Sequence, residues 1–216
     1  YKSNPYTKYF TSPDWVKFSL DVLGGKGQIG AFRYAPLIGP DILTGILSKV
    51  TGQSVLAFAK ENLFTPLGIV VEQNITFHNK EEQMDFYKAT DMSVWVADPN
   101  GINTGGWGLT LSLMDMAKIG ELIRNGGVFD GTRIVSEEWV RESTSEQSRW
   151  AERNLPYGYL WWILAQEHGC AAMGDGGNII YVSQDKNMIV AIASHFHPRA
   201  KDRIEFIKEY VEPIFD

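Results

Sequence analysis

Three apolar segments close to the end of the chain restrict its fold more than any other feature. They read YGYLWWIL, CAAMGDGGNIIYV and NMIVAIASHF, and they are rich in β-branched and aromatic residues. Because only short polar links separate them, we expect three neighbouring strands that run antiparallel. In YLWWIL, the alternation of side chains along a strand sends Trp161 and Trp162 to opposite faces of the sheet.

An amphipathic helix is expected directly after these strands, in RAKDRIEFIKEYVEPIF. Its apolar residues recur at helical spacing, so one side of the helix can lie on the sheet. The residues expected to make that contact are Ile204, Ile207, Tyr210 and Val211.

The part of the chain ahead of the sheet is predicted to be mostly helical. Helices are expected in TSPDWVKFSLD, DILTGILSKVTGQS, SVLAFAKENLFTPLGI, LTLSLMDMAKIGELIRNGG and SEEWVREST. The N-caps predicted for the first and last of these are Ser12, followed by Pro13 at the first helical position, and Ser136, while Ser112 and Asp115 resemble a capping box. GGKGQIG, residues 24–30, breaks the chain after the first helix.

Two further segments complete the predicted order of elements. Residues 70–106 combine short apolar groups with the turn sequence DPNG, so we expect mostly loop and short strand there. VFDGTRIV predicts a hairpin. The composite is an α+β fold, an antiparallel sheet flanked by helices. We expect a single domain over residues 1–216, with a helical portion at about 10–150 and the sheet plus C-terminal helix at about 157–216.

The composition excludes several classes of protein. The chain has 216 residues, of which 44% are hydrophobic, so it can bury a substantial core. With 20 basic and 26 acidic residues and no long like-charge runs, it offers no basic surface for nucleic acid. No apolar run approaches the roughly 20 residues that span a bilayer. The chain begins YKSNPYTKYF, without Met, which suggests a mature, trimmed or fragmentary product.

No cofactor or metal site is predicted. Cys170 is the single cysteine, which excludes an internal disulfide and a cysteine-based metal cluster. His195 and His197 would share one side of a strand, but no third ligand accompanies them at useful spacing, so we interpret them as the polar end of the last strand. The composition leaves the compartment open, and periplasmic, secreted and cytoplasmic locations are all compatible with it.

The tetrapeptide SQDK, residues 183–186, raises the question of a nucleophile. A serine three residues ahead of a lysine is a known arrangement for acyl transfer, but it requires a helix that carries both side chains on one face. The flanking NIIYV and NMIVAIAS have the pattern of strands. We therefore interpret SQDKN as a hairpin turn, with Ser183 and Lys186 exposed to solvent.

Taken in order, these elements resemble the last two-thirds of a serine hydrolase of the β-lactamase and penicillin-binding-protein type, in particular its esterase and amide-hydrolase branch. The resemblance covers nearly the whole chain and is carried by five segments. They are YAPLIGPDILTGILSKVTGQSVLAFAKENLFTPLGI, GGWGLTLSLMDMAKIGELIRNGG, RIVSEEWV, YGYLWWI and GDGGNIIYVSQDKNMIVAIAS. In this family a Ser-x-x-Lys supplies the nucleophile, a tyrosine shuttles protons, and a Lys-Thr-Gly or His-x-Gly edge strand closes the pocket.

The resemblance implies that Tyr34 of FRYAPLIG is the catalytic tyrosine. A phenol can act as a base only if a nearby positive charge lowers a pKa that is normally near 10, and the lysine of the family provides that charge. In this sequence Ala35 and Pro36 replace the usual Ser-Asn. The amide that would bind substrate or lysine is therefore absent, which weakens the expectation of true β-lactamase activity.

The resemblance also places Asp175, Gly176 and Gly177 at the Lys-Thr-Gly position, followed by Asn178, as the substrate-binding and oxyanion strand. A strand that approaches a substrate carbonyl closely is better without Cβ atoms, which fits the two glycines. The carboxylate of Asp175 stands where relatives carry a cation or a neutral histidine. We therefore expect the pocket to disfavour anionic substrates such as penicillins.

The nucleophile of the family has no counterpart in this chain. Ser183 is the only serine with a lysine three positions later, and no Gly-x-Ser-x-Gly occurs. We therefore expect a serine hydrolase that acts on small ester or amide substrates but is truncated and inactive as this chain, with the missing N-terminal segment of the same protein as its partner. The alternative is a non-catalytic relative that serves as a binding or assembly module.

Overall fold

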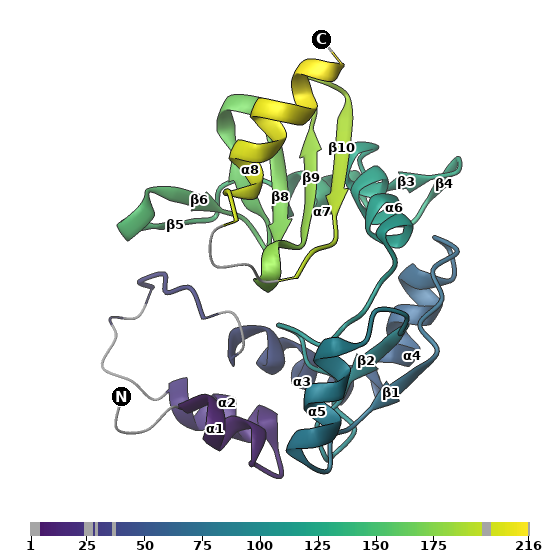
Figure 1. Cartoon of the computed structure of the whole chain (residues 1–216), viewed down its shortest axis with the longest axis vertical. Coiled ribbons are helices and arrows are strands. Elements are labelled where there is room, and N and C mark those ends of the chain that lie inside the picture. Colours follow the sequence, from purple (N-terminus) through teal and green to yellow (C-terminus); the bar gives the residue numbers. More distant parts are fainter. Residues whose placement is uncertain (1–4, 24–27, 29, 36–37, 196–199, 216) are drawn as a thin grey trace. The chain divides into compact units, whose positions relative to one another are not determined.

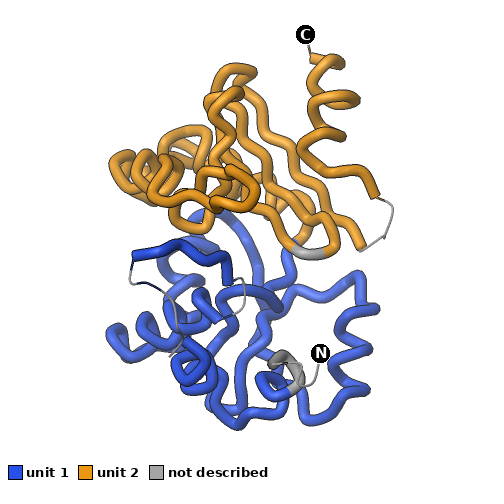
Figure 2. The backbone as a smooth tube through the Cα atoms, turned by 90° about the vertical axis from the view of Figure 1, so that its left-hand side faces the viewer, with its two compact units in different colours: residues 1–111 blue, residues 112–216 orange. Residues whose placement is uncertain are grey.

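The computed structural model describes residues 5–23, 28, 30–35, 38–195 and 200–215 (Figure 1). The chain divides into two compact units, residues 1–111 and 112–216 (Figure 2), and each is described by itself. Helices accompany an antiparallel sheet, so the predicted α+β class is confirmed. The expectation of a single domain stays a prediction.

The first unit is built mainly from helices. They are α1 (Pro5–Phe10), α2 (Trp15–Leu23), α3 (Ile38–Thr51), α4 (Val55–Ala59), which continues as the π-helical turn η1 (Lys60–Phe64), and α5 (Lys80–Lys88). Two short strands, β1 (Gln73–Ile75) and β2 (Val94–Val96), pair in parallel. The predicted DPNG turn is present, with Gly101 N–H donating to the carbonyl of Asp98 at 2.9 Å.

Helix α2 begins later than the sequence suggested. Its N-terminal cap is Asp14, whose carboxylate accepts the Lys17 N–H at 2.7 Å. Ser12 is instead hydrogen-bonded to the backbone of Asp14 just ahead of the helix. The predicted cap at Ser12 was therefore wrong by two residues. The predicted break at residues 24–30 lies largely outside the described residues.

Helix α5 lies in the region predicted to be loop and short strand. Its sequence KEEQMDFYK has no continuous apolar stripe, and none of its residues is fully buried. The sequence feature that indicates this helix is its N-terminal cap. The side-chain oxygen of Asn79 accepts the Glu82 N–H at 2.9 Å, and the Asn79 side-chain amide donates to the Glu82 carboxylate at 2.9 Å. Asn-x-x-Glu is a capping sequence, so the helix could have been predicted from its cap.

A buried aromatic cluster with a polar network holds the first unit together. Tyr9, Trp15 and Val96 form its centre. The Tyr9 hydroxyl donates to the carboxylate of Asp41, which is only 2% exposed and also accepts the Gly105 N–H at 2.8 Å. Because the Tyr9 hydroxyl, the Asp41 carboxylate and the Gly105 N–H are all hydrogen-bonded, they can be buried without a large desolvation cost, whereas the buried indole N–H of Trp15 has no acceptor among the described residues.

The second unit contains a six-stranded sheet. Its strands are β5 (Ser148–Trp150), β6 (Leu155–Tyr157), β7 (Trp162–Leu164), β8 (Gly169–Met173), β9 (Ile179–Ser183) and β10 (Met188–Ile192). They pair antiparallel in the order β10-β9-β8-β7-β6-β5. Around them lie α6 (Leu113–Arg124), the hairpin β3 (Val128–Phe129) and β4 (Thr132–Arg133), and α7 (Glu137–Ser143). The C-terminal segment consists of α8 (Arg203–Phe206), η5 (Ile207–Val211) and η6 (Glu212–Ile214).

The predicted antiparallel strands are confirmed, but CAAMGDGGNIIYV forms two of them, β8 and β9, and the short strands β5 and β6 extend the sheet. β5 and β6 are three residues each, too short to show a period in the sequence. The capping box of Ser112 and Asp115 on α6, the β3–β4 hairpin and the Ser136 cap of α7 are all present as predicted.

Helices cover both faces of this sheet. On one face, Ile179 and Tyr181 of β9 pack with Ile207 of the C-terminal segment. On the other face, Ile180 and Val182 pack with apolar residues of α6. Figure 1 shows the C-terminal segment crossing β8, β9 and β10. The alternation along β9 therefore determines which helix contacts which face.

The C-terminal segment contacts the sheet through fewer residues than predicted. Ile204, Ile207 and Val211 pack on the sheet, but Tyr210 is 53% exposed, so its predicted contact was wrong. A polar contact adds to the packing, because the hydroxyl of Tyr181 donates to the Glu212 carboxylate at 2.5 Å. Both groups are buried, and the bond therefore satisfies both.

The SQDK sequence forms the turn between β9 and β10, as predicted. Ser183 is the last residue of β9 and is 1% exposed, so the expectation that it is solvated was wrong. Its hydroxyl accepts the Lys186 N–H at 3.3 Å. No helix places the two side chains one turn apart, and this serine has a structural role in the turn.

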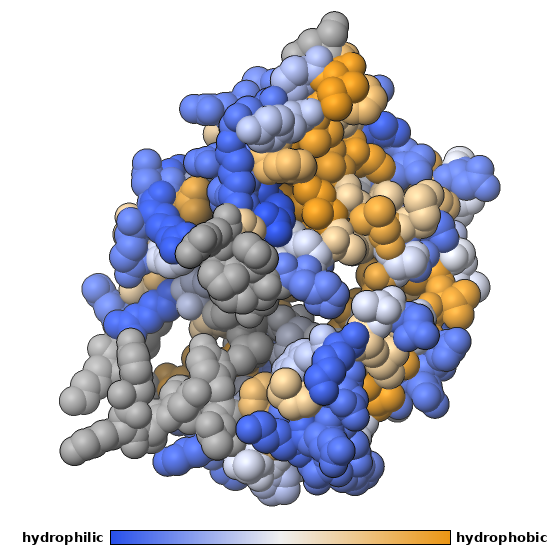
Figure 3. Space-filling view, viewed as in Figure 1, coloured by the Kyte–Doolittle hydropathy of each residue, from blue (hydrophilic) through white to orange (hydrophobic). Residues whose placement is uncertain are grey.

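Apolar side chains remain exposed in both units. Strand β10 is an edge strand in the sheet of the second unit, and hydrophobic residues gather over it and the C-terminal segment (Figure 3). A groove there is lined by residues 186–191, Val211 and Phe215. In the first unit, α3 exposes Leu43, Ile46 and Val50, which share one side of the helix.

None of the described helices is by itself both long enough and apolar enough to cross a membrane. Helix α3 and the segment Val55–Phe64 reach that length and hydropathy only when they are taken together, and the chain bends by 81° between them.

The single cysteine is expected to be unreactive in the folded chain. Cys170 lies in the buried cluster between the sheet and α6, and burial raises its pKa to about 12. A shift of this size lowers the thiolate fraction about a thousandfold at neutral pH. We expect an aromatic disulfide reagent to leave the native chain unmodified at about pH 8 and to modify one thiol fully in denaturant. Rapid modification of the native chain would contradict this burial.

Candidate active site

The strongest candidate site is the turn formed by residues 174–178, which joins β8 to β9. Gly176 and Gly177 both have positive φ angles, 78° and 91°. Such angles are unfavourable for residues with a Cβ atom, which explains the two successive glycines. CAAMGDGGNIIYV is therefore two strands and a turn, not the single strand that was predicted.

The position of this turn corrects one expectation about the site. The resemblance placed Asp175, Gly176, Gly177 and Asn178 on an edge strand, but β8 and β9 both have neighbours on each side. The four residues instead lie where one strand turns into the next. Asp175 contributes backbone to a 3-10 turn there, and its side chain lies outside what the structure describes.

Ser194 ties this turn to the end of β10. The Gly174 N–H donates to the Asn178 carbonyl at 2.9 Å, which closes the turn. The Ser194 N–H donates to the side-chain oxygen of Asn178 at 2.9 Å, and the Ser194 hydroxyl donates to the Gly176 carbonyl at 2.6 Å. The backbone of the turn is therefore held from the side of β10.

Arg203, at the start of α8, contacts the same turn and Ser194. Its Nε donates to the Gly177 carbonyl at 3.2 Å and its Nη2 to the Ser194 hydroxyl at 3.1 Å. Sequence reasoning missed both Arg203 and Ser194. Only the fold brings them to the turn, since Arg203 lies 26 residues beyond Gly177.

Tyr34 belongs to the first unit. It lies in an irregular segment just ahead of α3, and its side chain is 37% exposed. Ala35 is described next to it, whereas Pro36 lies outside the described residues. Partial exposure suits a residue that exchanges protons with a substrate. Its predicted position opposite the glycine turn stays a prediction, because the turn belongs to the second unit.

The described residues contain no cluster suited to a metal ion. No group of three or more histidine, cysteine, aspartate or glutamate side chains comes together among them. His195 is exposed beyond β10, and His197 lies outside the described residues.

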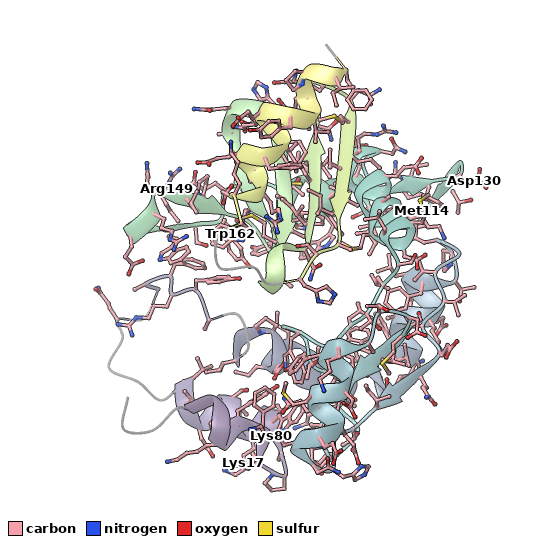
Figure 4. All side chains as sticks on the ribbon, in the orientation of Figure 1. Lys17, Lys80, Met114, Asp130, Arg149 and Trp162 are labelled. Atoms are coloured by element: carbon pink, nitrogen blue, oxygen red, sulfur yellow. The ribbon has the colours of Figure 1, made fainter. Side chains whose placement is uncertain are left out.

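Trp161, just ahead of β7, and Trp162, its first residue, lie on opposite faces of the sheet, as predicted. Trp161 belongs to the cluster beside α6. Trp162, labelled in Figure 4, pairs with Ala171 on the other face and contacts Tyr157 at a ring-centroid distance of 4.6 Å. Both rings are therefore part of the packing of the second unit.

The antiparallel sheet between helices has the fold of the β-lactamase-like proteins. The Beta-lactamase family model matches residues 30–211, and the chain belongs to this family. Its curated relatives include the 6-aminohexanoate-dimer hydrolase of Paenarthrobacter ureafaciens. The two are 25% identical over 186 residues, which cover 81% of this chain and 42% of the hydrolase.

Solved structures agree on the fold. One is a Bacillus anthracis protein provisionally described as a 6-aminohexanoate-dimer hydrolase, with a TM-score of 0.62 and 18% identity over 85% of this chain and 43% of that one. Another is a penicillin-binding-protein homologue from Caulobacter crescentus, with a TM-score of 0.60 and 15% identity over 92% of this chain and 62% of that one. The chain thus spans less than two-thirds of the length of each of these three proteins.

Proposed function

We propose that this chain is the C-terminal portion of a serine hydrolase that acts on small ester or amide substrates. The glycine turn at residues 174–178 carries the proposal, because Gly176 and Gly177 adopt positive φ angles and Gly176 carries no Cβ atom that would shield the backbone from a substrate carbonyl. Membership of the β-lactamase family supports it. So does the similarity to a protein named for hydrolysis of the 6-aminohexanoate dimer.

In this proposal each part of the chain has a distinct chemical role. A serine outside this chain attacks the carbonyl carbon of the substrate and forms an acyl-enzyme. Tyr34 receives the serine proton and passes it to the leaving group. A backbone N–H of the turn at residues 176–178 donates to the oxyanion, a contact worth about a few kcal/mol in the transition state. Water then attacks the acyl-enzyme and releases the acid.

The proposal requires an N-terminal segment of the same protein as a partner. The groove beside β10 is a suitable docking surface, since an edge strand offers unpaired backbone groups and the groove is lined with apolar side chains. The apolar side of α3, with Leu43, Ile46 and Val50, is a second surface that such a segment could cover. A segment that covered both surfaces would remove these apolar side chains from water.

A fluorophosphonate probe tests the proposal. We expect no serine of the 216-residue chain to be labelled, and a single serine upstream of Tyr1 to be labelled in the protein expressed from its longer reading frame. Peptide mass spectrometry identifies the labelled residue. The matched control is Ser183→Ala, which should label like the parent in both forms. Labelling that is lost in Ser183→Ala would contradict the proposal.

The substrate preference can be measured in the same longer protein. The carboxylate of Asp175 should disfavour anionic substrates by like-charge repulsion. We therefore expect faster turnover of a neutral ester than of a penicillin, and Asp175→Asn should narrow the difference. A preference for the penicillin would count against this role of Asp175.

A non-catalytic binding or assembly module is the second candidate. The replacement of the usual Ser-Asn by Ala35 and Pro36 favours it, because a substrate-binding amide is lost. The upstream sequence separates the two: a Ser-x-x-Lys ahead of an apolar helix supports the hydrolase, and a complete reading frame without one supports the module.

A further inference from the structure

Among the residues that the structure describes, the Arg203 guanidinium is bound by neutral oxygens. In addition to Gly177 and Ser194, it donates through Nη1 to the Lys201 carbonyl at 2.8 Å. Within the part of the chain that the structure describes, no carboxylate forms an ion pair with it. The three acceptors instead come from the glycine turn, from the end of β10 and from the start of α8.

The close approach of Arg203 explains why position 177 needs a glycine beyond its φ angle. A Cβ atom at Gly177 would lie 2.5 Å from Nη2 of Arg203 and 2.7 Å from Cζ. No side chain fits at that distance without moving the guanidinium. The glycine and the arginine are therefore parts of one arrangement.

The guanidinium is itself held in place. Arg203 is the first residue of α8, and the Asp202 carboxylate caps this helix by accepting the N–H groups of Ile204 and Glu205 at 2.9 and 3.2 Å. Ser194 accepts from Arg203 and donates to the Gly176 carbonyl at 2.6 Å. Arg203 thus contacts Gly177 directly and Gly176 through one hydroxyl.

We propose that Arg203 is the positioning residue of the glycine turn, acting directly on Gly177 and through Ser194 on Gly176. A planar guanidinium with several fixed donors can hold two carbonyls and a hydroxyl at once, and a lysine ammonium on a flexible stem does this less well. Because the carbonyls of Gly176 and Gly177 are held, the directions of the Gly177 and Asn178 N–H groups, which share their peptide planes, are set. The catalytic consequence of this arrangement rests on the proposed function; the positioning does not.

Amide hydrogen exchange of the 216-residue chain tests the positioning. Three N–H groups report on the turn, because they are hydrogen-bonded within it or to it: Gly174, Gly177 and Ser194. In Arg203→Ala we expect them to exchange roughly 10–100-fold faster, since charge-assisted hydrogen bonds are lost. Methylguanidinium added to this variant should restore part of the protection.

Arg124→Ala is the matched control. Arg124 also donates to a backbone carbonyl of the second unit, that of Asn187 at 3.2 Å, in the turn between β9 and β10. The Arg124→Ala substitution removes the same charge from a different turn, so the amides of Gly174, Gly177 and Ser194 should keep their wild-type exchange rates. Unchanged exchange of these amides in Arg203→Ala would overturn the proposal.

Two further variants keep the test decisive if Arg203→Ala fails to fold. Arg203→Lys keeps the positive charge but loses the planar set of donors of the guanidinium. Ser194→Ala removes the hydroxyl through which Arg203 acts on the Gly176 carbonyl. We expect faster exchange at the turn in both, and wild-type exchange in both would overturn the proposal.

Kinetics of the longer protein separate this proposal from the proposed function. Arg203→Ala should lower kcat by about 10–100-fold with little change in KM, because a displaced oxyanion donor affects the transition state most. An unchanged kcat in a variant whose turn exchanges faster would contradict the oxyanion role of the turn, and the exchange data would still establish the positioning.

Discussion

Replacing Asp41 by alanine is expected to lower the free energy of unfolding of the first unit by about 3–5 kcal/mol. The carboxylate is buried and accepts from the Tyr9 hydroxyl and the Gly105 N–H. Alanine leaves these donors buried without acceptors, next to a new cavity. Urea unfolding of the chain, with amide exchange read separately in each unit, measures the loss.

Asp85→Ala is the matched control for this prediction. Asp85 is an exposed aspartate on α5 that forms an ion pair with Lys88 at 3.3 Å. Surface ion pairs of this kind contribute little, so its stability should stay close to wild type. A loss of less than 1 kcal/mol in Asp41→Ala would show that the Tyr9–Asp41 network is not what holds the first unit together.

The same carboxyl predicts a dependence of stability on pH. Burial raises the pKa of Asp41, and the nearby charge of Asp98 adds to the effect. Because the folded pKa lies above the unfolded value of about 3.9, the folded unit binds this proton more tightly. The contribution of the protonated Asp41 carboxyl to the free energy of unfolding is fully present below about pH 4, and it is lost as the pH rises through the folded pKa. Asp41→Asn should remove this dependence.

Replacing Ile207 by alanine is expected to destabilise the second unit by about 3–4 kcal/mol. Ile207 is fully buried and packs with Ile179, Tyr181 and Ala171, at the centre of the contact between the C-terminal segment and the sheet. The substitution removes three carbon atoms and leaves a cavity that the strands cannot close. Urea unfolding followed by exchange of the β8 and β9 amides measures the effect.

Ile214→Ala provides the matched control on the same segment. Ile214 is 73% exposed, so the identical chemical change should cost no more than about 0.5 kcal/mol. Equal losses in the two variants would mean that the segment is not anchored through Ile207.

The resemblance to serine hydrolases directed attention to residues 174–178 of the second unit, and the structure changes how their sequence is interpreted. GDGG was interpreted as a strand that approaches a substrate. The structure adds positive φ angles at both central glycines and a guanidinium packed against Gly177. Arg203 could not be assigned to this turn beforehand, because a hydrogen bond between residues so far apart depends on how the last helix lies on the sheet.

Local chemistry explains which features were visible in the sequence. Short β-branched and aromatic runs between polar links identified the strands, and the Ser112 and Ser136 caps identified two helices, because each of these signals acts within a few residues. Helix α5 was overlooked since its exposed surface carries no apolar stripe, and β5 and β6 were too short to show a period. Ser183 was predicted to be exposed and is buried, and Tyr210 was predicted to contact the sheet and is exposed. Both predictions were wrong because the neighbouring elements determine how much of each side chain is covered.

By itself, the sequence determined the α+β class, the antiparallel strands, the turn at SQDK and the similarity to the β-lactamase family, all of which depend on short-range patterns. Only the tertiary structure decided which side chains meet across the sheet and around the glycine turn. The physical reason is that packing joins residues far apart in the chain: Arg203 reaches Gly177, and Asp41 accepts from Tyr9 and Gly105, through folded elements whose spacing the linear order does not encode.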